Sequence, residues 1–424
     1  MVSGLSETSL LDDWLTWQEQ CHVKEIDLGL TRVASVYKTL SLPSSHSAYT
    51  ITVAGTNGKG SSVAMLEAIF IAAGYQVGVY STPHLKRYNE RIRINGKPVA
   101  DALLTRSFAK IDAARQATSL SYFEFGTLAA LDIFEDQKVA IQILEVGLGG
   151  RLDAVNIVDA DAALITSISV DHIDWLGDDR SQIALEKAGV LRANQMAVCG
   201  DATVPSSLLE YAKKLGTQLT LAAKDFNVQV EHNRWCLLAK HSLAGYYPLP
   251  ALQGDHQIQN ASAVVSLLAN IQTEVPVNRS SIELGLQQAS LLGRLQKIRS
   301  TPDIFLDVAH NAESANVLAQ FIKTKQVNGQ VHAVFSILAD KQLDEVVKPF
   351  IGLIDQWHIA PLESARSLPV LDLHRYLTVE CSQQCLKHDS IQLALQEVKR
   401  TINSNDLVIC FGSFYVVEAC LEAL

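Results

Sequence analysis

The chain has 424 residues, 48% of them hydrophobic and 19% charged, which is enough apolar sequence for roughly two or three domains with large cores. Acidic residues outnumber basic ones by 45 to 35, and the formal net charge of −10 argues against nucleic acid as a partner. The seven cysteines form no Cys-x-x-Cys pair, and no apolar run reaches the roughly 18 residues of a membrane span. We therefore expect a cytoplasmic protein with free thiols and no membrane segment.

Residues 8–40 carry apolar side chains at helical spacing and predict two amphipathic helices. The turn Asp27-Leu28-Gly29-Leu30 lies between them. From the residues alone, Asp27 is expected to cap the second helix, because a carboxylate can accept hydrogen bonds from the first helical N–H groups.

The next segment has the pattern of a phosphate-binding loop. Residues 50–54 alternate β-branched and small residues, as a buried strand does, and apolar residues recur at helical spacing over 61–73. The glycine-rich turn between them would direct backbone N–H groups at phosphate oxygens, with Lys59 reaching the terminal phosphates. Gly60 stands where the general pattern has a magnesium-binding Ser or Thr. The residues expected to contact the nucleotide are Thr56, Asn57, Gly58, Lys59, Gly60 and Ser61.

Polar side chains follow three predicted strands. A strand over 76–80 leads into Ser81-Thr82-Pro83-His84, an apolar strand over 139–146 contains Glu145, and a strand over 161–167 precedes His172. We expect Glu145 and His172 at equivalent ends of neighbouring strands close to the phosphate loop. Magnesium ligation by the pair is favoured, and a purely structural histidine is the alternative.

The remaining pattern predicts two α/β domains. Helices are expected at 100–116, 123–134 and 181–193, a strand at 196–199, and a small antiparallel addition within 217–250. After a helix that carries Asn260, residues 285–299 mark the boundary. We expect residues 1–292 to form a P-loop ATPase domain with a mostly parallel sheet, and residues 293–424 a smaller Rossmann-like α/β domain. Its strands are expected at 304–308, 332–337, 356–360 and 407–411, and its helices near 313–325, 341–353, 389–403 and 414–423.

A set of motifs in chain order resembles the folylpolyglutamate synthase family of the Mur ligase superfamily. The resemblance is carried by the loop at 55–61, by 81–84, by the specific motif Glu145-Val146-Gly147-Leu148-Gly149-Gly150-Arg151-Leu152-Asp153, and by 171–177, 186–189, 293–294 and 307–311. The turn at 27–30 and the segment 122–125 further resemble the branch that is also a dihydrofolate synthase.

This resemblance implies an ATP-dependent ligase that joins L-glutamate to dihydropteroate and to reduced folates through an acyl phosphate. It implies ATP, two Mg²⁺ ions and a carbamylated Lys187, and it leaves a monovalent cation open. An ammonium at Lys187 would repel magnesium, whereas a carbamate carries the opposite charge. A monomer is expected, with no nucleic acid or membrane partner.

The resemblance also assigns roles to residues. It implies metal ligation by Thr82, Glu145 and His172, and catalytic roles for Lys59, Lys187 and His172. It implies nucleotide contacts from Asn260, Arg294 and Asp307. Substrate contacts are implied for Asp27, Leu28, Gly29, Leu30, Tyr122, Phe123, Glu124, Phe125, Arg151, Asp153 and His310. The sequence departs from the family pattern where Thr82 replaces Ser, Ala312 replaces Pro and Phe125 replaces Tyr.

Three alternatives stay open. The chain could extend folates without accepting dihydropteroate. It could be another Mur-type ligase, although only about 50 residues precede the loop, too few for an added nucleotide-binding domain. It could be a nucleotide-dependent switch, although it lacks the Asn-Lys-x-Asp segment that would read guanine.

Overall fold

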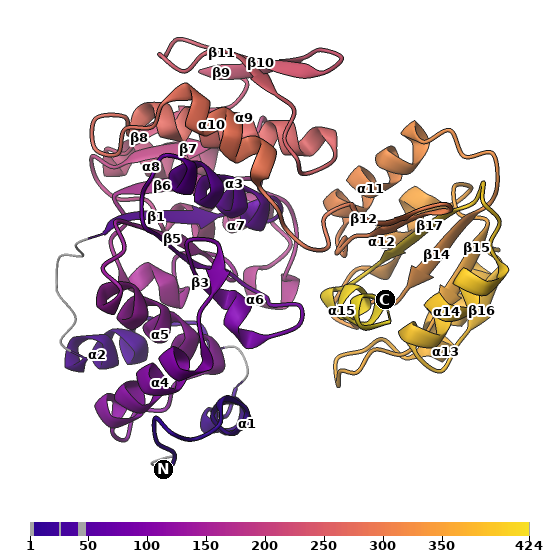
Figure 1. Cartoon of the computed structure of the whole chain (residues 1–424), viewed down its shortest axis with the longest axis horizontal. Helices are drawn as coiled ribbons and strands as arrows, with labels where there is room; N and C mark the ends of the chain where they lie inside the picture. Colours follow the sequence, from indigo (N-terminus) through magenta and orange to yellow (C-terminus); the bar gives the residue numbers. More distant parts are fainter. Residues whose placement is uncertain (1–3, 25–26, 41–47, 424) are drawn as a thin grey trace. The chain divides into compact units, whose positions relative to one another are not determined.

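The computed structural model describes residues 4–24, 27–40 and 48–423, which fold into two compact units (Figure 1). The first unit comprises residues up to 168, 179–251 and 257–290. The second comprises residues 169–178, 252–256 and 291 onward. Each unit contains its own sheet. No described helix combines the length and the apolar character that crossing a membrane requires.

The first unit is built on an eight-stranded sheet with the order β4-β3-β2-β5-β1-β6-β7-β8. The strands from β2 through β8 in this order are parallel, and β3 and β4 extend the sheet antiparallel at one edge. This confirms the predicted mostly parallel sheet. The strands are β1 Tyr49–Ala54, β2 Val77–Tyr80, β3 Ile92–Ile94, β4 Lys97–Pro98, β5 Ile141–Glu145, β6 Ala162–Ile165, β7 Met196–Cys199 and β8 Gln218–Leu221.

Two strand predictions need correction. β8 was expected in the antiparallel addition, but it pairs parallel with β7 in the main sheet. The addition consists of β9 (Phe226–Val230), β10 (Arg234–Ala239) and β11 (Gly245–Pro248). The strands that carry Glu145 and precede His172 were expected to be neighbours, but β1 lies between β5 and β6. Both therefore flank the strand that enters the phosphate loop.

Helices cover both faces of this sheet, as an α/β architecture requires. One of them, α10, was missed from the sequence and packs closely on α3, where a Cβ on Gly285 would lie 2.5 Å from the Cα of Ile69. The helix α2 begins at Thr31 after Leu30, so Asp27 is not its cap as expected. The helices are α1 Leu11–Cys21, α2 Thr31–Thr39, α3 Lys59–Ala72, α4 Asp101–Arg115, α5 Tyr122–Asp136, α7 Arg180–Ala188, α8 Ser206–Leu215, α9 Asp255–Asn270 and α10 Arg279–Gln288.

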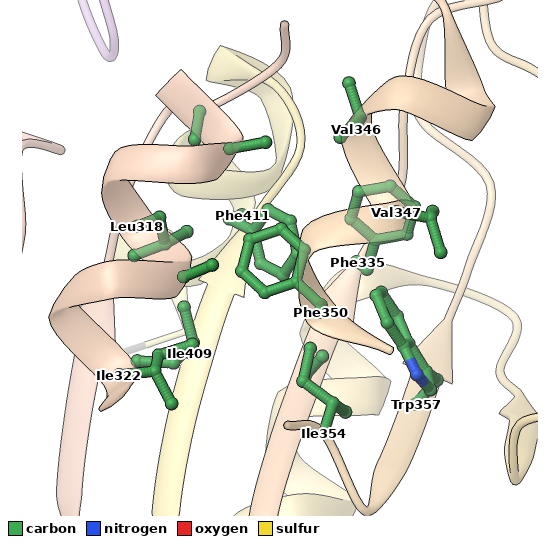
Figure 2. Close-up of a cluster of buried hydrophobic side chains, with 14 of the residues drawn as sticks. Leu318, Ile322, Phe335, Val346, Val347, Phe350, Ile354, Trp357, Ile409 and Phe411 are labelled. Atoms are coloured by element: carbon green, nitrogen blue, oxygen red, sulfur yellow. The ribbon is translucent and has the colours of Figure 1, made fainter. Parts of the chain in front are cut away.

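The second unit contains a six-stranded sheet with the order β12-β13-β17-β14-β15-β16, parallel except for β12. Figure 2 shows part of its core, where Phe335, Phe350 and Phe411 meet beside Trp357. β12, β16 and α13 were not predicted. The elements are β12 Gln296–Ser300, β13 Asp303–Leu306, β14 Val331–Phe335, β15 Gln356–Ile359, β16 Cys385–Lys387, β17 Leu407–Phe411, α6 Ile173–Leu176, α11 Ala312–Thr324, α12 Leu343–Val347, α13 Val370–Arg375, α14 Ile391–Thr401 and α15 Phe414–Glu422.

Three histidines form a hydrogen-bonded row across this second sheet. His332 Nδ1 lies 3.4 Å from His358 Nε2, and His358 Nδ1 lies 3.1 Å from His388 Nε2. Burial lowers the pKa of all three, and that of His358 to about 4, even though the carboxylates of Asp406 and Glu397 oppose the shift. The folded protein therefore holds this row neutral.

We expect the second unit to lose stability on acidification. The pKa of His358 is lower in the folded chain than its ordinary 6.5, so the unfolded chain binds more protons below pH 6.5 and stability falls as pH drops toward 4. The loss should be on the order of 1 kcal/mol between pH 7.5 and 5.5. The free energy of unfolding is measured with urea at pH 7.5 and at pH 5.5. The change between the two pH values should be smaller in His358→Gln than in the exposed control His232→Gln. The same difference in both variants would contradict this assignment.

Candidate active site

The phosphate loop takes its shape from glycine and from a neighbouring helix. α3 begins at Lys59, and Gly58 before it has a φ of +87°, a conformation that favours glycine. A Cβ on Gly58 would also lie 2.5 Å from Oδ1 of Asn260, which reaches the loop from α9. The predicted nucleotide contact Asn260 thus lies against the loop.

The loop is further tied to the segment that follows β6. The backbone N–H of Thr56 donates to the carbonyl of Ser167 at 2.8 Å, and that of Asn57 donates to the Ser167 hydroxyl at 3.1 Å. Thr166 Oγ1 donates to the Asn57 carbonyl at 2.6 Å. Lys59 Nζ donates to the carbonyls of Gly55 (2.9 Å) and Thr56 (3.1 Å), so its ammonium is held over the loop. A loop fixed in this way can receive phosphate oxygens without first being ordered.

The carboxyl ends of β2 and β5 bring two predicted metal ligands together. The backbone N–H of Thr82 donates to Oε2 of Glu145 at 3.3 Å, and Glu145 is 4% exposed. A buried carboxylate is a ligand that suits a hard divalent cation. Within residues 4–24, 27–40 and 48–423, no three His, Cys, Asp or Glu side chains cluster closely enough to hold a metal ion by themselves. Mg²⁺ sites commonly combine one or two carboxylates with substrate phosphates and water.

Asp153 organises the loop that follows Glu145. Its carboxylate accepts hydrogen bonds from the backbone N–H groups of Gly147 (2.9 Å), Leu148 (3.1 Å) and Val155 (3.0 Å). Burial nevertheless raises the pKa of Asp153 to about 6. Because all three donors are backbone groups, Asp153 fixes the course of the loop in the described structure.

The same loop docks on the end of α7 that carries Lys187. The Arg151 N–H donates to the Glu186 carbonyl at 2.8 Å, and the Arg151 guanidinium pairs with the Glu186 carboxylate at 2.8 Å. A Cβ on Gly150 would lie 3.2 Å from the Cα of Lys187, so glycine permits the close approach. Lys187 is 2% exposed. The loop thus joins Glu145 to the predicted site of carbamylation.

The turn at residues 27–30 also reaches this loop, since the Gly29 N–H donates to the Leu152 carbonyl at 3.2 Å. Asp27 pairs with Arg32 at 2.6 Å and with His22 Nε2 at 3.0 Å. The hydrogen bond from His22, with added attraction from Arg32, lowers the pKa of Asp27. The predicted dihydropteroate turn and the specific motif therefore lie together.

The segment 122–125 divides into two kinds of residue. Phe125 is fully buried, with its ring centroid 5.6 Å from that of Trp17, and Glu124 caps α5 through the N–H of Ser121 at 2.7 Å. These two side chains serve packing and capping in the structure. Tyr122 and Phe123 are partly exposed.

In the second unit, Asp171 joins several predicted site residues. It accepts hydrogen bonds from the His172 backbone N–H at 2.8 Å, from Asn311 Nδ2 at 2.9 Å and from Lys341 Nζ at 2.7 Å. His310 Nε2 lies 3.5 Å from the same carboxylate. Burial opposes ionisation, but the hydrogen bond from His310 and the cation of Lys341 hold the pKa of Asp171 well below its usual value. Lys341, whose side chain is 7% exposed, was missed from the sequence because no local motif marks it.

Arg294 and Asp307 also lie in the second unit. Asp307 accepts hydrogen bonds from the backbone N–H groups of Leu295 and Ala309, both at 2.8 Å. Burial raises the pKa of Asp307, and the positive charge of Arg294 acts in the opposite direction. The Arg294 guanidinium lies 5.3 Å from the ring centroid of Phe414. Protein contacts therefore hold both Asp307 and Arg294 in place at the start of the second sheet.

The structure thus distributes the predicted residues between the two units. The second unit holds His172, Arg294, Asp307 and His310. The first holds Asp27, Leu28, Gly29, Leu30, the loop at 56–61, Thr82, residues 122–125, Glu145, Arg151, Asp153, Lys187 and Asn260.

Comparison with known proteins agrees with this arrangement. Residues 53–268 match the Mur ligase middle domain, and residues 293–414 match the Mur ligase glutamate ligase domain. The Escherichia coli protein named dihydrofolate synthase/folylpolyglutamate synthase is 39% identical over 98% of this chain and 96% of its own.

Two solved structures of similar proteins have bound ligands. The Escherichia coli FolC structure in complex with DHPP and ADP is 39% identical, with a TM-score of 0.92 over 98% of both chains. The bifunctional synthase from Yersinia pestis complexed with AMPPNP and Mn ion is 39% identical, with a TM-score of 0.90 over 99% of this chain and 98% of that one. The chain belongs to the dihydrofolate synthase/folylpolyglutamate synthase family of Mur ligases.

Proposed function

We propose that this chain is an ATP-dependent carboxylate–amine ligase that adds L-glutamate to dihydropteroate and to reduced folates. The observation that carries the proposal is the connection within the first unit. The loop after Glu145 joins the Glu145 edge to the dihydropteroate-like turn through the contacts of Asp153 and Gly29. The strand that enters the phosphate loop, β1, pairs directly with β5, which ends at Glu145. Family membership supplies the substrate class.

The reaction needs activation because a carboxylate has no adequate leaving group. One carboxylate oxygen of the acceptor bonds to the γ-phosphorus of ATP, and the bond from that phosphorus to ADP breaks. The neutral amine of glutamate then attacks the acyl carbon, phosphate leaves, and the nitrogen loses a proton. The protein contributes positioning and charge neutralisation. Backbone N–H groups of the loop and Lys59 hold the phosphates during transfer.

A divalent cation fits the oxygen ligands at the end of β5. Thr82, Glu145 and His172 would hold Mg²⁺, and the metal would supply charge neutralisation at the transferred phosphoryl group. We assign two such ions to the complete site. A monovalent cation remains an open alternative.

We assign different substrates to the two domains. Residues 1–292 bind ATP and the acceptor, and residues 293–424 contribute Arg294 and Asp307 to the nucleotide and His310 to glutamate. Asn260 completes the nucleotide contacts from the first domain. The enzyme works as a cytoplasmic monomer on small-molecule substrates.

Phosphate release tests the function directly. The purified protein is supplied with ATP and Mg²⁺, then with glutamate, with dihydropteroate or with a reduced folate, singly and in pairs. We expect steady phosphate release only when glutamate and an acceptor are both present. Equal ATP hydrolysis under all conditions would favour a switch. Release with reduced folate alone as acceptor would restrict the enzyme to polyglutamylation.

We expect Lys187 to carry a carbamate in the active enzyme. Its burial and the nearby loop of Glu145 make an ammonium beside a divalent cation unfavourable, because both are positive and poorly solvated. Enzyme equilibrated with ¹³C-labelled bicarbonate should show a carbamate carbon signal that disappears in Lys187→Ala. The matched exposed variant Lys213→Ala should keep the signal. An unmodified amine in a well-resolved density map of the nucleotide complex would refute the assignment.

A further inference from the structure

Two hydrogen-bonded arms hold Asp27, and the first of them runs through His22. Nε2 of His22 lies 3.0 Å from Oδ2 of Asp27, and Nδ1 of His22 lies 2.9 Å from Oγ of Ser119. His22 directly follows α1, and its side chain is 11% exposed. The first arm therefore joins the turn 27–30 to the segment that leads into α5.

The second arm runs through Arg32 in α2. Its guanidinium contacts Oδ2 of Asp27 at 2.6 Å and donates to the Asp27 carbonyl at 2.8 Å. The same guanidinium donates to Oε1 of Glu124 at 3.2 Å, and Oε2 of Glu124 accepts from the Ser121 N–H at 2.7 Å. Both arms thus connect the turn 27–30 with the start of α5, where the second predicted acceptor segment lies.

The contacts of His22 determine which of its ring nitrogens carries hydrogen. The hydrogen bond from His22, with added attraction from Arg32, lowers the pKa of Asp27, so this carboxyl group is ionised at neutral pH and can only accept. Nε2 of His22 therefore donates to Asp27. In the neutral ring Nδ1 then accepts, and its donor is the Ser119 hydroxyl. Its two neighbours hold His22 in a single tautomer.

The two arms meet at one carboxylate oxygen of Asp27 and leave the other to a ligand. Both His22 and Arg32 contact Oδ2. Among the described residues, only Nζ of Lys24 approaches Oδ1, at 3.8 Å, which is beyond hydrogen-bonding distance. The Asp27 side chain is 25% exposed. Oδ1 is therefore available to an N–H donor, and the contacts at Oδ2 fix its direction. An acceptor fixed in advance loses little conformational freedom on binding.

We propose that His22, itself held by Ser119, is a positioning residue for dihydropteroate. It fixes the Asp27 carboxylate so that Oδ1 accepts a hydrogen bond from an N–H group of the pterin. This inference rests on the proposed ligase function and on the assignment of Asp27 to dihydropteroate, and it deepens both. It adds two residues, His22 and Ser119, that lie outside the motifs found in the sequence.

The first test compares two substitutions of His22. His22→Leu removes both ring nitrogens, whereas His22→Gln keeps an amide N–H near the place of Nε2 and can still donate to Asp27. We expect kcat/KM for dihydropteroate to fall by about 10-fold in His22→Leu, the lower range for losing a hydrogen bond to a charged group, and to recover mostly in His22→Gln. A reduced folate should be affected little by either change. The exposed control His232→Gln should alter neither acceptor.

The second test separates positioning from general support of the fold. If His22 acts through Asp27, the double variant His22→Leu/Asp27→Ala should lose no more with dihydropteroate than Asp27→Ala alone, because the effects of coupled residues do not add. A residue that only supports the fold would add its own loss and would also lower the rate with a reduced folate.

The third test uses the unaltered enzyme and does not depend on how a variant folds. In ¹⁵N NMR spectra of histidine-labelled enzyme, the signals of His22 are those that disappear in His22→Gln. We expect them to show hydrogen on Nε2 and none on Nδ1.

The outcomes distinguish this inference from the function on which it rests. Additive losses in the double variant, equal losses for both acceptors in His22→Leu, or a neutral ring with hydrogen on Nδ1 would each overturn the role of His22. An unaltered enzyme that ligates neither acceptor would instead refute the proposed function.

Discussion

Lys59→Ala is expected to lower kcat by about 10²- to 10³-fold or more, while the protein keeps its fold, because removing one preorganised electrostatic group commonly has an effect of this size. In the structure the Lys59 ammonium donates to two loop carbonyls, at 2.9 and 3.1 Å. We propose that it faces the γ-phosphate, on a loop held by Ser167 and Thr166. Removing it deletes positive charge without opening the core.

Turnover and circular dichroism measured on the same preparation check this result. The control Lys213→Ala removes an exposed lysine from α8 and should leave both measurements unchanged. A Lys59→Ala enzyme with unaltered turnover would refute the assignment of the phosphate loop. Loss of the folded signal would instead show that Lys59 holds the loop together through its contacts with the Gly55 and Thr56 carbonyls.

Local patterns in the sequence were sufficient for most of the first unit. The strand, glycine turn and helix around Lys59 were predicted correctly because residue periodicity and glycine conformation act over short distances. The order of the strands could not be obtained in this way, since strand neighbours are selected by packing between distant segments. The insertion of β1 between β5 and β6, and the pairing of β8 with β7, are both results of that long-range selection.

The candidate site shows the same limit. All of residues 122–125 were assigned to the acceptor, but their side chains have different environments at the start of α5. Glu124 is placed to cap the helix and Phe125 turns into the core beside Trp17. Lys341 was missed because no local motif marks it, and its role becomes visible only through its contact with Asp171, 170 residues earlier in the chain.

The second large effect is expected at Asp27. The sequence contains a single phosphate loop, so dihydropteroate and the longer folates must bring their carboxylates to the same γ-phosphate. Because the two acceptors differ in the distance from pterin to carboxylate, one pterin position cannot serve both. We assign the dihydropteroate position to the turn 27–30 and to Tyr122 and Phe123, where the Gly29–Leu152 hydrogen bond joins the turn to the loop after Glu145.

Asp27→Ala should therefore lower kcat/KM for dihydropteroate by about 100-fold, the upper range for losing a charged hydrogen-bond acceptor, and should largely spare a reduced folate. The turn should survive, because Arg32 still contacts Glu124 at 3.2 Å. Asp27→Asn keeps the shape of the side chain. Its kcat/KM for dihydropteroate should lie between the values of the unaltered enzyme and of Asp27→Ala. The control Asp13→Ala removes an exposed carboxylate from α1 and should change neither reaction.

The paired rates for the two acceptors decide between the possible roles of Asp27. Equal losses in both reactions would mean that its pairing with Arg32 and His22 is structural, and the separate dihydropteroate position would fall. An enzyme that extends folates but never accepts dihydropteroate would leave only polyglutamylation.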